Sequence, residues 1–191
     1  MNILKIILKK IEEARIRHEW RKETYAKKNC AVFKISNNYK VVSCFYDKST
    51  GWGLYDDPVH TISDDQPPMV LGEAVIETLK QPNVKKIGQE FFSKEREKEW
   101  LKRNFKLKSF NALHKNSLCD IILYKDDFIV SPTKLDDDGR GWVCDKERKR
   151  IYSYSSLTSE CIGNILISLT EKSQGHFKSV PMIPDNLSKL K

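Results

Sequence analysis

Two stretches of this 191-residue chain decide the fold that the sequence predicts: Cys30-Ala-Val-Phe-Lys-Ile35 and Cys119-Asp-Ile-Ile-Leu-Tyr124. Each begins an apolar, strand-like run. Each is followed by a second short run, Val41-Val42-Ser43 in the first case and Ile129-Val130-Ser131 in the second. Polar residues separate the runs, and this pattern is typical of a β-hairpin. The sequence therefore predicts two hairpins of similar make-up.

Further matches recur downstream at almost the same spacing. The two cysteines are 89 residues apart, Trp52 and Trp142 are 90 apart, and Gly72 and Gly163 are 91 apart. Self-similarity at a nearly fixed period indicates two related units. We expect the matching tryptophans to fill the core under a sheet. We expect each glycine, early in a predicted helix, to let that helix approach the sheet closely.

The predicted fold class is α+β, with two related halves that each combine a β-hairpin or small sheet with a helix. Connections inside each half are hairpins, so the strands are expected to be mainly antiparallel. We expect one globular body with these segments: a basic amphipathic helix at 1–28, the first repeat at 29–84, a basic linker helix at 85–116, the second repeat at 117–173, and a C-terminal tail at 174–191.

Positive charge is concentrated outside the repeats. The chain carries a net charge of +8, while residues 1–28 and residues 85–108 each hold nine Lys or Arg against four Glu. Residues 1–27 show apolar positions at helical spacing with basic residues between them, which predicts an amphipathic helix. We expect its apolar stripe to dock on the protein's own body or on a partner, rather than on a membrane surface.

The cysteines and histidines predict neither a disulfide framework nor a metal site. Five cysteines without a C-x-x-C pair favour a reducing, cytoplasmic location. Cys30 and Cys119 begin apolar runs and are expected in the core. The four histidines are far apart, which disfavours zinc. We expect no metal, no cofactor, no small-molecule substrate and no enzymatic activity.

Aspartates occur in four clusters, each in a predicted turn: Asp56-Asp57, Asp64-Asp65, Asp126-Asp127 and Asp136-Asp137-Asp138. Grouped carboxylates can hold a hard cation or act as an acid and base pair, as in a small hydrolase. Asp is also favoured in turns because its side chain accepts hydrogen bonds from nearby backbone amides. We favour the turn interpretation.

A nucleic-acid-associated module is the main alternative. The basic segments 1–28 and 85–108 carry interleaved aromatic residues, and this combination is typical of nucleic-acid binding. Glutamates alternate with lysines at 94–99, however, as on a solvated helix face with ion pairs.

The arrangement of short motifs over about residues 29–171 resembles a family of contact-dependent growth inhibition immunity proteins. The motifs that carry the resemblance are Cys30 to Ile35, Val41 to Phe45, Gly51-Trp52-Gly53, Asp57-Pro58, Leu71-Gly72, Leu118-Cys119 to Leu123, Ile129 to Pro132, Trp142 and Ile162-Gly163.

The resemblance implies a small cytoplasmic protein, encoded beside a toxin, that binds the C-terminal domain of that toxin and blocks its active site. It implies no catalytic residues. Many immunity proteins against nucleases are acidic, whereas this chain is basic, so its locally acidic turns are candidates for the contact surface. The partner-binding residues expected on this basis are Asp56, Asp57, Asp126, Asp127, Asp136, Asp137 and Asp138.

Overall fold

A computed structural model describes residues 3–48, 53–88, 91, 93–113, 116–135 and 142–172. Its strands are β1 (Lys28–Ile35), β2 (Asn38–Asp47), β3 (Gly53–Ser63), β4 (Val84–Lys85), β5 (Ser117–Tyr124), β6 (Asp127–Leu135), β7 (Trp142–Cys144) and β8 (Arg150–Ser153). Its helices are α1 (Ile3–Ala26), α2 (Pro68–Leu79), α3 (Lys94–Phe105), the single turn α4 (Phe110–Leu113) and α5 (Ser159–Lys172).

The strands form one eight-stranded sheet in the order β3-β2-β1-β5-β6-β7, with β4 paired to β2 and β8 paired to β6. Every pair is antiparallel except the short pair of β2 with β4. The predicted α+β class and mainly antiparallel sheet are confirmed.

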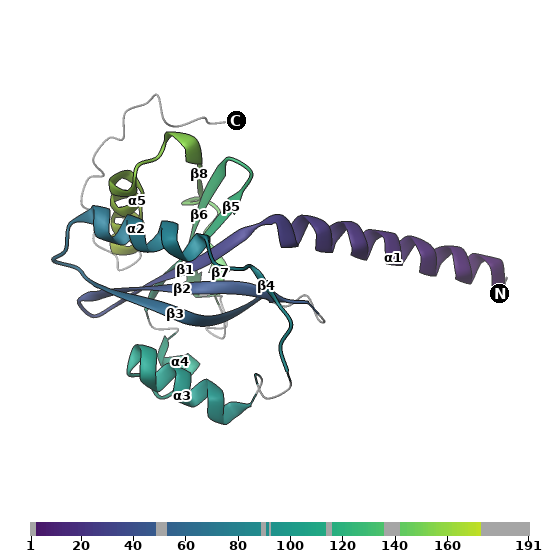
Figure 1. The fold of residues 1–191 in the computed structure, drawn as a ribbon, viewed down its shortest axis with the longest axis horizontal. Coiled ribbons are helices and arrows are strands. Elements are labelled where there is room, and N and C mark those ends of the chain that lie inside the picture. The colour runs from purple at the N-terminus through teal and green to yellow at the C-terminus, as the bar shows by residue number, and fades with distance from the viewer. Residues whose placement is uncertain are drawn as a thin grey trace.

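One face of the sheet is covered by α2 and α5, which lie together on the same side (Figure 1). The buried residues Val32, Val41 and Phe128 of the sheet pack against Leu71 of α2 and Leu166 of α5. Cys30 and Cys119 are buried in the same core, as predicted. Apolar burial of this kind is the main favourable contribution to folding.

The two helices cross at Gly72 and Gly163. A Cβ atom on Gly72 would stand 1.8 Å from the carbonyl oxygen of Ser159, and one on Gly163 would stand 1.8 Å from that of Pro68. Glycine is thus needed because each helix passes against the backbone of the other. The prediction that these glycines bring the helices close to the sheet is wrong: they bring the helices close to each other.

The opposite face of the sheet carries α3 and α4, which lie beneath the β2–β3 end in Figure 1. Trp100, Leu101 and Phe105 of α3 pack with Phe33 and Val42 of the sheet. The helix begins after Ser93, whose Oγ accepts a hydrogen bond from the Arg96 amide at 3.2 Å and so caps the N-terminus of α3.

The two halves each contain a β-hairpin and a later helix, and they meet at β1 and β5. In that pair Cys30 lies opposite Ile121 and Val32 lies opposite Cys119, on either side of the Ala31–Asp120 pair. Duplication of one unit stays a prediction. The positions of the Trp52 and Trp142 side chains and the tail at 174–191 fall outside what the structure describes.

Helix α1 projects away from the sheet along most of its length (Figure 1). The predicted helix is confirmed, but docking of its apolar residues on the body is not observed, since Ile11, Ile16 and Trp20 are 60%, 55% and 53% exposed. Over the described part of the chain, no helix is long and apolar enough to cross a membrane.

Candidate partner-binding surface

Asp56 and Asp57 lie in strand β3 and not in a turn, which corrects the sequence-based placement. The pairing of β3 with β2 shifts register between Val42 and Ser43, so that Val42 faces Val59 while Ser43 faces Asp56. Pro58 has no N–H to donate to the sheet and fits such an irregularity. The alternation of a regular strand is lost here, and this is why the pattern suggested a turn.

The Asp56 carboxylate is held by two cations from the linker segment. Its Oδ2 accepts from Lys85 Nζ at 3.1 Å and its Oδ1 accepts from Arg96 Nη2 at 2.8 Å. The Lys85 ammonium also lies over the Phe45 ring, and the Arg96 guanidinium lies over the Phe91 ring. Asp56 therefore fastens β4 and the start of α3 to the sheet edge.

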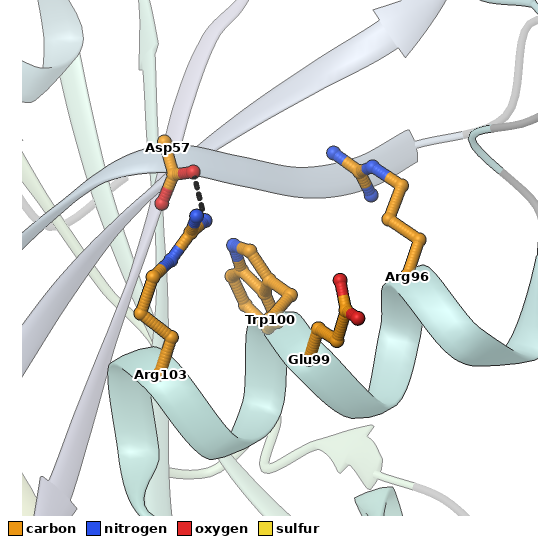
Figure 2. A pocket seen from close by; sticks show the side chains of 5 residues that line it. All are labelled: Asp57, Arg96, Glu99, Trp100 and Arg103. Carbon is orange, nitrogen blue, oxygen red and sulfur yellow. Dashed lines mark hydrogen bonds and ion pairs between the residues drawn. The ribbon is translucent and has the colours of Figure 1, made fainter.

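Asp57 is also bound by side chains of α3, further along the helix. Its carboxylate accepts from Arg103 Nη2 and from Asn104 Nδ2. A small cavity of about 230 Å³ opens beside it, lined by Asp57, Arg96, Glu99, Trp100 and Arg103 (Figure 2). Three cations of the basic segment 85–108, Lys85, Arg96 and Arg103, are thus paired with β3 carboxylates.

Asp126 lies in the turn between β5 and β6, as predicted, but its carboxylate binds a distant segment and not the amides of its own turn. Its Oδ1 accepts from the Ser155 amide at 2.8 Å, and its Oδ2 accepts from the hydroxyls of Ser153 and Ser155. Asp127 is exposed and begins β6 opposite Tyr124.

The structure does not bring the predicted partner-binding residues into one cluster. Asp56 and Asp57 lie on β3 at one end of the strand order, while Asp126 and Asp127 lie at the β5–β6 hairpin in the other half. Asp136, Asp137 and Asp138 lie outside the described residues.

Part of the α3 side of the sheet is partly exposed, and it forms a surface that we call the open face. Asn29, Ile122, Ile129 and Ile151 lie directly opposite one another across β1, β5, β6 and β8. Residues opposite in an antiparallel sheet share a face, and so do residues two apart on one strand. Asp120 lies two residues before Ile122 on β5, so it shares this face and stands between Ile122 and the buried Leu118. None of the five is fully buried, and Ile151 is 46% exposed.

Asp120 is a residue that the sequence analysis missed. It lies between Ala31 of β1 and Ser131 of β6, and burial raises the pKa of its carboxyl to about 6. Among the described residues no Lys, Arg or His forms an ion pair with it. The available signal was a single charge inside the apolar run 118–123.

The thiols of Cys30, Cys44 and Cys119 are held in their neutral form. Burial raises the pKa of Cys119 to about 12, and it raises the pKa of Cys30 and Cys44 as well. A thiolate is the reactive form of cysteine, so these thiols have the character of core residues. In the residues described here, no group of three or more His, Cys, Asp or Glu is placed to hold a metal ion.

Comparison with known proteins gives structural likeness without close sequence likeness. No family model matches the chain, and no curated protein matches it closely in sequence. A protein of unknown function from Neisseria meningitidis is 21% identical, with a TM-score of 0.59, over 76% of this chain and 94% of the other. A chain of the CdiA-CT/CdiI toxin and immunity complex from Yersinia pseudotuberculosis is 20% identical, with a TM-score of 0.57, over 77% and 97%. At these identities the likenesses establish a shared fold.

Proposed function

We propose that this chain is an immunity protein that binds the C-terminal toxin domain of a contact-dependent growth inhibition system and blocks its active site in the cytoplasm. The observation that carries the proposal is the fold shared with a chain of a toxin and immunity complex, over 77% of this chain and 97% of that one. The motif resemblance over residues 29–171 supports the same class. The role is one of binding and not of catalysis.

The acidic residues predicted from the sequence stay part of this proposal, with unequal roles. Asp56 is tied to Lys85 and Arg96, and Asp126 is tied to Ser153 and Ser155. Charge reversal at either position would disturb the fold as well as any interface. Asp127 is exposed, so Asp127→Lys is the variant that tests toxin contact with the least structural disturbance.

Co-expression with the neighbouring toxin tests the function. The probe is the C-terminal domain of the secreted protein encoded beside this chain, expressed in a sensitive bacterial host. We expect the wild-type chain to restore growth, and an unrelated toxin domain expressed in the same host to remain toxic.

A titration separates a binding inhibitor from an enzyme. Because an inhibitor must occupy each toxin molecule, the purified chain should abolish toxin activity at a ratio of about one to one, with a stable complex on size-exclusion chromatography. Protection at a small fraction of the toxin concentration would contradict the proposal, as would failure to protect at all.

A further inference from the structure

The open face combines a row of isoleucines with two acceptor side chains, Asp120 and Asn29. Ile122, Ile129 and Ile151 stand side by side on three neighbouring strands, and all three keep some exposure to solvent. The side chains of α3 cover the neighbouring part of the same face, around Phe33 and Val42, but these isoleucines are not part of that buried cluster. Ile151 is exposed and Ile122 and Ile129 are partly exposed, and apolar side chains that reach the surface side by side are candidates for a protein–protein contact.

Two side chains at the edge of the row, Asp120 and Asn29, carry acceptor oxygens that the described residues leave unpaired, although the Asn29 amide also interacts with the Tyr46 hydroxyl. Asp120 forms no ion pair there, and the Oδ1 atom of Asn29 is buried and accepts no hydrogen bond from the described residues. Asn29 lies opposite Ile122, which is two residues along β5 from Asp120, so the two groups are diagonal neighbours on one face. Leaving the buried Asn29 oxygen without a partner costs free energy, and the partly buried Asp120 carboxylate stays open to a partner.

The groups around Asp120 define the chemistry of a suitable occupant. The carboxylate and the amide oxygen are both acceptors, so the complementary group is a donor with several N–H groups and a positive charge. An arginine guanidinium meets both requirements, because its fork of donors can serve a carboxylate and a neighbouring carbonyl together. An ammonium group offers the same charge with fewer directed bonds.

We propose that the open face is the docking surface for the toxin domain, with an apolar patch of the toxin over Ile122, Ile129 and Ile151 and one cationic toxin side chain seated on Asp120 and Asn29. This inference rests on the proposed function. It goes further by committing to a surface and to the charge of the partner at its centre. The apolar contact supplies affinity, and the charge pair selects the partner.

Binding measured by calorimetry between the full chain and the toxin domain tests the proposal. We expect Asp120→Asn to weaken binding at least tenfold at pH 7.5, since it removes the charge and keeps the shape. We expect Ile151→Ser to weaken binding about tenfold, because it removes apolar contact from an exposed site that tolerates substitution.

Two matched variants control for general effects of charge and exposure. Asp65→Asn changes an exposed acid in the turn before α2, and Met69→Ser changes a 47% exposed apolar residue on α2. Both lie away from the open face, and both should bind within twofold of the wild type.

The outcomes separate this inference from the proposed function. Tight wild-type binding that Asp120→Asn and Ile151→Ser leave unchanged would overturn the docking surface and leave the immunity function standing. Absence of wild-type binding would overturn both. A self-associating wild type whose dimer is lost in Ile151→Ser would assign the face to a second copy. Tighter toxin binding by a variant that ends at Lys172 would show that residues 173–191, and not the toxin, occupy the open face.

Discussion

The charged carboxylate of Asp120 lowers the stability of the folded chain. Burial raises its pKa from the ordinary value of 3.8 to about 6, so at neutral pH the charged form is less stable in the folded protein than in the unfolded chain. A residue that lowers the stability of the fold and lies on a partly exposed face is a candidate for a functional position. We therefore expect a partner to pair with the charge of Asp120.

The pH dependence of stability tests this argument. Because the folded pKa is raised, the stabilising contribution of Asp120 is complete below pH 3.8 and is lost as the pH rises through about 6. A difference of one in pKa corresponds to about 1.4 kcal/mol, and the partial exposure of the group reduces the effect. We expect Asp120→Asn to stabilise the protein by about 1 to 2 kcal/mol at pH 7.5, and by much less at pH 4.

Urea unfolding of both proteins at the two pH values measures the effect, with Asp65→Asn as the control. Equal stability of Asp120→Asn and wild type at pH 7.5 would mean that the carboxylate is already paired or well solvated. The argument for an unsatisfied charge would then fail.

The sequence predicted buried cysteines but not the position of Asp120, and the reason is physical. Cys30 and Cys119 lie on the face covered by two helices, where an apolar run and a buried face coincide. Asp120 lies on the face that α3 covers only in part, and the extent of that cover depends on packing between distant segments. A single charge inside the apolar run 118–123 was visible, but the sequence does not say which face of the sheet remains open.

At the scale of elements, the crossing of α2 and α5 fixes the two halves against each other. Each helix begins next to the glycine of the other, through Pro68 beside Gly163 and Ser159 beside Gly72. Close approach of two backbones excludes any side chain at the crossing. The spacing of the glycines was evident in the sequence, whereas the surface that they approach was not.

Alanine at either crossing glycine should therefore destabilise the fold. A new Cβ at 1.8 Å from a carbonyl oxygen forces the helices apart, which we expect to outweigh the gain of about 1 kcal/mol from the better helix propensity of alanine. We expect Gly72→Ala and Gly163→Ala each to lower the free energy of unfolding by about 2 kcal/mol.

Thermal and urea unfolding measure this change. Gly53→Ala is the matched control, because a Cβ there would meet the Tyr46 ring only at an ordinary 3.5 Å; it should change stability by less than about 0.5 kcal/mol. A crossing variant as stable as the wild type would show that the helices can separate freely.

The strand and helix boundaries were predictable where local pattern and tertiary role agree. The helix expected around Gly72 is α2 at Pro68–Leu79, and the basic helix expected within 85–116 is α3 at Lys94–Phe105. The placement of Asp56 and Asp57 in a turn was wrong because the register shift of β3 hides the strand alternation. The apolar residues Ile11, Ile16 and Trp20 of α1 are not covered by the body of the protein, because a helical apolar stripe does not specify what covers it; docking of α1 on a partner stays a prediction.

At the scale of the whole molecule, positive charge and candidate contact surface are separated. The basic helix α1 projects from the body (Figure 1). Three cations of the second basic segment, Lys85, Arg96 and Arg103, are paired with carboxylates of β3. The open face carries the unpaired carboxylate of Asp120 instead. A chain with a net charge of +8 can therefore still present a local site for a cationic partner.

The most direct test of the account is the methyl NMR spectrum of isoleucine-labelled protein, recorded before and after addition of the toxin domain. The account predicts that the methyl signals of Ile122, Ile129 and Ile151 on the open face shift or broaden most. Signals of Ile76 and Ile167, which pack against the core beneath α2 and α5, should change little. Saturable binding that shifts Ile76 and Ile167 and leaves the open-face isoleucines unchanged would contradict it.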